Sequence, residues 1–254
     1  TGKRKRIKRT IKGREQDAEL LLAKLQVDYK EGNYVEPNKI TVAEWMHTWL
    51  NDYKKLDLRP NTWESYETII RVHINPTIGA LYLQELRPEH IQKLYNQKLK
   101  EGKSPQTIHR IHAVLHSALK QALKNRIIMY NPAEAVTLPK TTQKEIKVLT
   151  VEEQNKFLDV LDNDRLGPAF ITLLGTGMRR GELLALTWQD IDFKNGIINI
   201  RRDMVYTKEG LVFQEPKTKS SKRIVPLLDI VIEALKKHRE NMLSEGHYGA
   251  DKPV

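Results

Sequence analysis

The sequence predicts a mainly α-helical chain with a small β-sheet in its C-terminal part. Between residues 41 and 124, apolar side chains recur every three or four positions and capping residues separate the segments, as in amphipathic helices. Between residues 196 and 227, apolar and polar side chains alternate over three short stretches, as in β-strands. With 254 residues, the chain is long enough for about two domains, each with a core.

The composition narrows the range of functions. Lys and Arg number 43 against 32 Asp and Glu, and this net charge of +11 favours a polyanionic partner. The chain has no cysteine, which excludes a disulfide framework and a thiolate metal site. No apolar run approaches the ~18 residues of a membrane span and no signal-peptide pattern is present, so we expect a soluble cytoplasmic protein.

The N-terminal segment is strongly basic. Residues 1–14 hold eight basic side chains and no acid, a composition that fits either a solvated tail or an edge strand. A helix is expected from Glu15 to about Lys30, followed by a turn-rich linker over residues 31–39. One strand and one helix bury no core by themselves, so this segment does not form a domain alone.

Four helices are expected in residues 41–124. Thr41 and Glu44 form a capping box that begins the first, Pro60 begins the second, Pro88 the third, and Ser104 caps the fourth. Their apolar stripes and short connections predict a compact bundle. Three histidines, at positions 109, 112 and 116, share one face of the last helix. Since no cysteine or acidic cluster accompanies them, we interpret them as packed or exposed side chains and expect no metal site.

A polar, lysine-bearing stretch over residues 137–147 is the best domain boundary in the chain. Thr150 and Glu153 then form a capping box for the next helix. Strands are expected at 196–202, 211–215 and 223–227, and the last two flank PKTKSSK as a lysine-rich hairpin tip. A further helix is expected over residues 230–235.

The most informative stretch is GTGMRRGELLAL, residues 175–186. The Gly-Thr-Gly breaker turns the chain, so that Arg179 and Arg180 begin a new helix whose N-terminus favours an anion. An arginine at this place offers a planar fork of donors that matches two phosphate oxygens. Glu182 lies three residues further on, close enough to brace one guanidinium. Spacing alone also fits a surface arginine pair on a turn.

Residues 176–192, TGMRRGELLALTWQDID, resemble the first catalytic-arginine box of the tyrosine recombinase (phage integrase) family, especially integrases of temperate phages and integrative conjugative elements. The resemblance implies a helical core-binding bundle plus a partial α+β tyrosine-recombinase catalytic domain. It divides the chain into residues 1–36, the C-terminal part of an arm-type DNA-binding domain with its linker, residues 41–136, a SAM-like core-binding domain, and residues 146–254, part of the catalytic domain.

The resemblance also implies roles for individual residues. Arg179 matches the catalytic arginine and Glu182 its supporting acid. Lys217 matches the lysine that protonates the leaving 5′ oxygen, with Lys219 as the fallback because the hairpin is about one residue longer than in some relatives. The implied DNA contacts are distributed over the basic N-terminus, the helical bundle, the arginine box and the hairpin: Lys3, Arg4, Lys5, Arg6, Lys8, Arg9, Thr62, Tyr66, Lys103, Ser104, Thr107, Arg110, Arg180, Lys219 and Lys222.

The implied reaction is site-specific DNA recombination. A tyrosine attacks a DNA phosphodiester, leaves a 3′-phosphotyrosine, and a 5′ hydroxyl of the partner strand reverses the step. Arginines replace the divalent ions of other phosphoryl-transfer enzymes, so no metal and no cofactor is expected. The implied partner is double-stranded DNA, at the core and arm sequences of an attachment site, bound by a homotetramer in the bacterial nucleoid.

Part of the family's pattern is missing from these 254 residues. The H-x-x-R-H box and the nucleophilic tyrosine are expected far beyond the lysine hairpin. His238 and Arg239 lie too early for that box, and Tyr206 and Tyr248 lack the context of the nucleophile. We therefore expect a chain that is truncated at both ends and inactive in strand cleavage by itself.

Two other functions are compatible with parts of this pattern. A DNA-binding or architectural protein could have the integrase fold without strand transfer. An RNA-binding helical protein would explain the positive charge, but it would not explain Arg179 and Lys217 in their sequence contexts.

Overall fold

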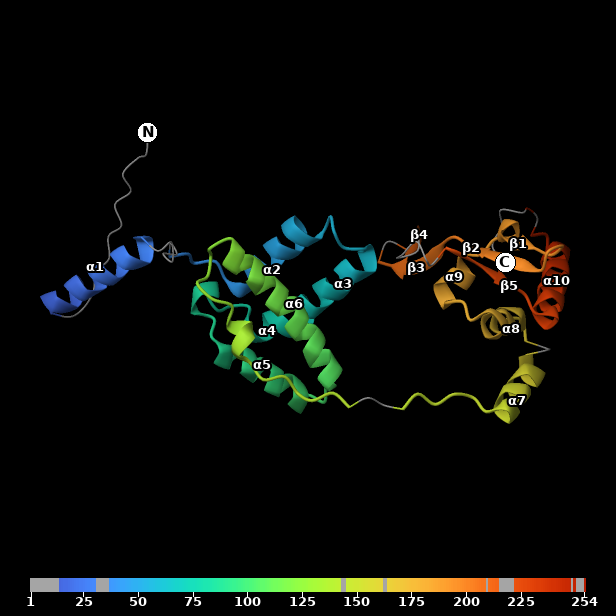
Figure 1. Cartoon of the computed structure of the whole chain (residues 1–254), viewed down its shortest axis with the longest axis horizontal. Helices are drawn as coiled ribbons and strands as arrows, with labels where there is room; N and C mark the ends of the chain where they lie inside the picture. The colour runs from blue at the N-terminus through green and yellow to red at the C-terminus, as the bar shows by residue number, and fades with distance from the viewer. Residues whose placement is uncertain are drawn as a thin grey trace, which may run out of the picture. The chain divides into compact units, whose positions relative to one another are not determined.

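The computed structural model describes residues 14–30, 37–142, 145–161, 164–208, 210–214, 222–247, 249 and 254. The chain divides into two compact units, Thr1–Thr142 and Gln143–Val254, and each is described by itself (Figure 1). Residues 1–13 of the basic N-terminal segment, for which a solvated tail and an edge strand were both compatible with the sequence, and most of the lysine-rich hairpin tip lie outside the described residues. In the described part, no helix is long and apolar enough to cross a membrane.

The regular elements that the structure describes in the first unit are helical, and the helices that the sequence predicts there are confirmed. Several continue into π-helical or 3₁₀ turns (η). The elements are α1 (Glu15–Lys30), α2 (Val42–Thr48), η1 (Trp49–Lys54), α3 (Pro60–Ile69), η2 (Ile70–Ile74), α4 (Asn75–Ile78), η3 (Leu83–Glu85), α5 (Pro88–Lys100), α6 (Pro105–Lys124) and η4 (Pro132–Ala135).

The predicted caps account for where these helices begin. The Thr41 hydroxyl accepts a hydrogen bond from the backbone N–H of Glu44, and the Glu44 carboxylate accepts one from the backbone N–H of Thr41 at 2.7 Å. The Ser104 hydroxyl likewise accepts from the backbone N–H of Thr107. Each bond satisfies an N–H group that the first turn of a helix leaves without an intrahelical partner.

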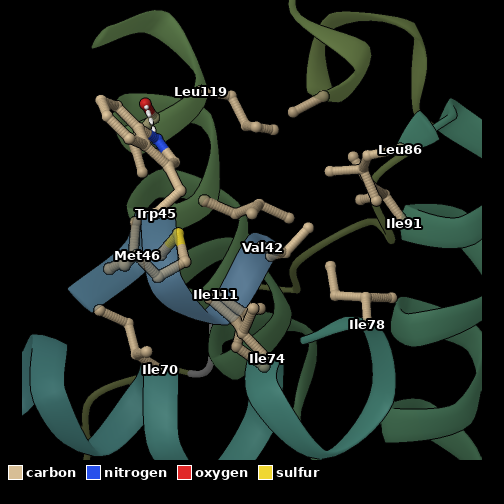
Figure 2. Close-up of a cluster of buried hydrophobic side chains, with 14 of the residues drawn as sticks. Val42, Trp45, Met46, Ile70, Ile74, Ile78, Leu86, Ile91, Ile111 and Leu119 are labelled. Atoms are coloured by element: carbon tan, nitrogen blue, oxygen red, sulfur yellow. Dashed lines mark hydrogen bonds between the residues drawn. The ribbon is translucent and has the colours of Figure 1, made fainter. Parts of the chain in front are cut away.

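The apolar faces of the helices between α2 and α6 meet in one core (Figure 2). Trp45 and Met46 of α2, Ile74 of η2 and Ile111 of α6 are all buried there. The Trp45 indole N–H donates to the backbone carbonyl of Ala118 at 2.9 Å, so its one polar group is satisfied inside the core. This packing gives the bundle a rigid frame from which surface side chains project.

The second unit combines helices with short antiparallel strands. Its helical elements are α7 (Val151–Leu161), α8 (Gly167–Thr176), α9 (Arg180–Leu184), η5 (Trp188–Asp190) and α10 (Asp229–Ser244). Its strands are β1 (Ile191–Asp192), β2 (Ile197–Ile200), β3 (Asp203–Thr207), β4 (Gly210–Gln214) and β5 (Arg223–Pro226). A three-stranded sheet has the order β1-β2-β5, and β3 and β4 form a separate two-stranded sheet.

The predicted pairing of the last two strands was wrong. Within the described residues β4 pairs with β3, whereas β5 pairs with β2, with Ile200 opposite Arg223. A tight turn explains this: β3 ends at Thr207 and β4 begins at Gly210, whose φ of +111° suits a glycine, so the neighbouring segments close at little entropic cost. The sequence prediction also missed β3, which contains Tyr206.

Candidate active site

The turn between α8 and α9 positions the arginine box as the sequence predicts. Helix α8 ends at Gly177, whose φ of +61° is the left-handed conformation that glycine adopts without strain. The Gly177 N–H donates to the carbonyl of Leu173 at 2.9 Å and closes the helix. Two residues later Arg179, in extended backbone conformation, caps α9. Arg180 is the first residue of that helix.

Glu182 binds the exposed Arg179 from a buried position. Its side chain is buried, with 3% exposed, whereas that of Arg179 is 71% exposed. Oε1 of Glu182 accepts from Nη1 of Arg179 at 2.9 Å, and Oε2 accepts from the Arg179 backbone N–H, also at 2.9 Å. The expected contact between the two residues is therefore present, and the guanidinium keeps a large solvent-facing surface.

A second arginine, which the sequence analysis did not include in the site, reaches the same carboxylate. Arg223, the first residue of β5, donates from Nη1 to Oε1 of Glu182 at 3.0 Å and from Nη2 to Oε2 at 2.9 Å. This is a fork-to-fork pair, the strongest geometry available to an arginine and a carboxylate. The only sign of Arg223 in the sequence was its place at the start of a predicted strand. Nothing in the local spacing connects it to Glu182, so its role was missed.

The two arginines keep the Glu182 carboxylate ionised. Burial by itself raises the pKa of Glu182, but hydrogen bonds from Arg223 and Arg179 outweigh this effect and lower the pKa to about 2. The same bond raises the pKa of Arg223. At neutral pH the three groups therefore carry two positive charges and one negative charge.

The N-terminus of α9, which we expected to favour an anion, contributes little to anion binding. Helix α9 contains five residues, so few peptide dipoles are aligned behind Arg179. The positive charge that the site offers to an anion comes instead from the guanidinium of Arg179. Arg180 is exposed beside it and forms no ion pair with any residue that the structure describes.

A comparable arrangement lies where β2 ends. The Asp190 side chain is 4% exposed, and its Oδ2 accepts from the backbone N–H of Thr187 at 3.1 Å and from Nη2 of Arg202. The same Nη2 donates to the Thr187 hydroxyl at 3.0 Å. This buried carboxylate ties the end of a strand to η5, which follows the arginine box.

Those predicted DNA contacts of the first unit that the structure describes lie on or directly before two helices, α3 and α6. Lys103 and Arg110 are exposed at the start of α6, beside the capping pair Ser104 and Thr107, whose hydroxyl oxygens are 3.0 Å apart. Tyr66 of α3 is half-buried and packs against the core, so it offers less free surface than we expected. Its ring stacks on that of the buried Trp49, with the ring centres 6.0 Å apart.

The other predicted contacts divide into described and undescribed residues. Thr62 is half-buried in the first turn of α3, and Lys222 is exposed directly before β5. The remaining candidates lie outside the described residues: Lys3, Arg4, Lys5, Arg6, Lys8, Arg9, Lys217 and Lys219.

The histidine row of α6 has local partners. His109 Nε2 lies 2.9 Å from the carbonyl oxygen of Pro139, and His112 Nδ1 lies 3.1 Å from the hydroxyl of Tyr95. Burial lowers the pKa of His112, which favours its neutral form. These contacts agree with our interpretation of the row as packed or exposed side chains.

Two family models match the chain. The N-terminal SAM-like domain of phage integrases matches residues 41–99, and the phage integrase family model matches residues 147–249, which include the whole arginine box. The chain belongs to the phage integrase family. The first match falls on the helical bundle, and the second on the unit that holds Arg179, Glu182 and Arg223.

Curated relatives of this phage integrase family member cover most of the chain. A tyrosine recombinase XerC-like protein of Caldanaerobacter subterraneus subsp. tengcongensis is 30% identical over 85% of the chain and 59% of its own length. The ICEBs1 integrase of Bacillus subtilis is 26% identical over 94% of the chain and 65% of its own length. The chain therefore spans about three fifths of the length of these relatives.

Two solved integrase structures share the fold. The Tn1549 transposon integrase, in complex with a circular intermediate DNA, superimposes with a TM-score of 0.71 at 24% identity, over 80% of this chain and 66% of that protein. A lambda integrase dimer bound to a core site gives a TM-score of 0.63 at 20% identity, over 79% of this chain and 70% of that protein.

Proposed function

We propose that this chain binds double-stranded DNA and supplies part of the active site of a site-specific tyrosine recombinase. One observation carries the proposal: an exposed arginine in the family's first arginine box is held by a buried, ionised glutamate. An arginine fixed in this way can bind a phosphate without first losing its conformational freedom, which is what a preorganised catalytic cation requires.

In the proposed reaction, a tyrosine oxygen attacks the phosphorus of a DNA phosphodiester and the 5′ oxygen leaves with a proton. Arg179 stabilises the negative charge that develops on the phosphate oxygens, and Lys217 donates the proton. A 5′ hydroxyl then attacks the 3′-phosphotyrosine and releases the tyrosine. The energy of the phosphodiester bond is retained in the covalent phosphotyrosine, so strand exchange needs no nucleotide hydrolysis.

The helical unit would contact the DNA backbone. Lys103, Ser104, Thr107 and Arg110 lie at the start of a 20-residue helix, where N–H groups and positive side chains together suit phosphates. The basic residues of the N-terminal segment would bind arm sequences, and four copies would assemble on an attachment site. The complexes of the Tn1549 and lambda integrases with DNA support a DNA partner for this fold.

Salt-dependent DNA binding tests the first half of the proposal. The 254-residue chain should bind duplex DNA with an affinity that falls steeply as salt rises, because bound phosphates release counterions. Deletion of residues 1–14 removes eight positive charges, and the slope of log affinity against log salt should become shallower by about 0.9 for each phosphate that the protein no longer binds. An unchanged slope would mean that this segment does not touch DNA.

Strand cleavage tests the second half. The product of the complete gene is incubated with a nicked duplex. The sequence of this duplex is that of the joined ends in the excised, circular form of the mobile element. Denaturing gels detect a covalent protein–DNA adduct. An adduct on a tyrosine supports the recombinase. Tight, salt-sensitive binding without any adduct would instead support an architectural DNA-binding protein.

A further inference from the structure

The structure assigns a role to Arg223 that rests on the proposed function. We propose that Arg223 is a positioning residue: through Glu182 it fixes the direction of Arg179 and leaves that arginine with its full positive charge for the scissile phosphate. Arg223 does not need to touch DNA for this role. Its partner is the carboxylate that holds the catalytic arginine.

The hydrogen-bond geometry supports the positioning. Arg179 donates to Glu182 from Nη1 to Oε1 and from its backbone N–H to Oε2, so both of these bonds come from the residue whose direction is to be fixed. Arg223 engages both carboxylate oxygens at 3.0 and 2.9 Å, which adds a constraint on the plane of the carboxylate from outside α9. Because Arg223 stands in a strand paired with β2, its own position is set by the ladder of the sheet.

The balance of charge supports the second part of the inference. A buried carboxylate paired with Arg179 alone would neutralise the charge that the phosphate needs. Arg223 adds one positive charge next to Glu182, and its side chain is only 31% exposed, so solvent screens that charge less than on an open surface. The three groups together keep one net positive charge, and the most exposed of them is Arg179.

The same unit contains a matched control. Arg202 also binds a buried carboxylate, that of Asp190, and its side chain is 42% exposed. The other contacts of that pair run to Thr187 and to Arg201, whose Nε lies 3.9 Å from Oδ1 of Asp190, and none of them involves Arg179 or Glu182. Replacement of Arg202 therefore removes an arginine from a buried ion pair of the same unit and leaves the support of Arg179 intact.

The experiment compares single-turnover cleavage of the nicked duplex by the complete gene product and its Arg223→Gln, Arg223→Lys and Arg202→Gln variants. Arg223→Gln should cleave at least about tenfold more slowly, the lower end of what loss of an outer supporting residue costs, with DNA affinity within about twofold of wild type. Arg223→Lys should recover part of the rate, because an ammonium restores the charge but not the fork. Arg202→Gln should cleave at a rate close to wild type.

Two outcomes would overturn the inference. Cleavage by Arg223→Gln at the wild-type rate would mean that Arg179 needs no support from β5. An equal loss of rate in Arg202→Gln and Arg223→Gln would mean that any broken ion pair in this unit damages the fold. Thermal denaturation of each variant, measured alongside, shows whether a slow variant is also an unfolded one.

A second readout separates this inference from the proposed function. In the 254-residue chain, the pKa of the Glu182 carboxyl is followed by carbon-13 NMR, and Arg223→Gln should raise it while Arg202→Gln leaves it unchanged. If that shift appears but the wild-type protein forms no adduct, the support of Glu182 by Arg223 stands and the recombinase proposal falls. If the wild-type protein forms the adduct and Arg223→Gln neither shifts the pKa nor slows cleavage, only the inference about Arg223 falls.

Discussion

The carboxylate of Glu182 and the guanidinium of Arg223 form two hydrogen bonds, of 3.0 and 2.9 Å, between residues 41 positions apart in the chain. The bonds connect α9 with β5, and hence connect the arginine box with the sheet. Arg179 is therefore supported by a residue from outside its own motif.

The stability of the second unit should depend on the ionisation of Glu182. Its pKa is lowered from 4.5 to about 2, so its contribution is complete above pH 4.5 and is lost as the pH falls from 4.5 towards 2. Glu182→Gln should lower the free energy of unfolding by about 2–3 kcal/mol at pH 7 and by much less near pH 2. Urea denaturation at both pH values measures this difference. The exposed Glu240→Gln in α10 is the control, and an equal loss in both variants would contradict the prediction.

Arg179→Ala should reduce strand cleavage by the complete gene product by about 10²-fold or more, because it removes a preorganised donor from the phosphate. DNA affinity should change far less, since many other phosphate contacts remain. Single-turnover cleavage and a binding titration on the same duplex separate the two effects. Arg180→Ala is the neighbouring control. If it proves the more damaging change, the assignment within the arginine pair is reversed.

Gly181→Ala should destabilise the second unit, because α9 lies directly against β3 at this residue. A methyl group would overlap Oδ1 of Asp203 and would lie 2.7 Å from the carbonyl oxygen of Met204. Forcing the backbone of β3 away should cost about 1–3 kcal/mol, the usual range for overpacking. Chemical denaturation measures this cost. Leu184→Ala, at an exposed position of the same helix, should have a small effect, and similar losses would argue against a tight contact at Gly181.

Lys217 can be tested as the general acid with a modified substrate. A 5′-bridging sulfur leaves without a proton, so a general acid becomes unnecessary. Lys217→Ala should therefore cripple cleavage of ordinary DNA and be largely rescued on the sulfur-containing duplex, as measured by adduct formation. Lys219→Ala and Lys222→Ala should affect both substrates alike, as phosphate contacts would. Rescue of Lys219→Ala alone would move the acid two residues along the chain.

The sequence by itself determined the local features. Apolar periodicity and capping residues located the helices of the bundle, because the partners in a helix lie three or four residues apart. The contact between Arg179 and Glu182 was foreseeable for the same reason, since three residues of separation in one helical turn bring the two side chains together. The family's arginine box is also a continuous stretch and could be read directly from the chain.

Only the tertiary structure decided which distant segments meet. The tight turn between Thr207 and Gly210 makes β4 pair with β3, and β5 pairs with β2 instead. The pairing of β5 with β2 places Arg223 beside Glu182. Strand pairing depends on the relative entropic cost of closing alternative loops and on the register across many residues. No local sequence pattern specifies which pairing forms. The sequence therefore reveals the partner of Glu182 within its own helical turn, Arg179. Its partner from another strand, Arg223, is determined by the fold.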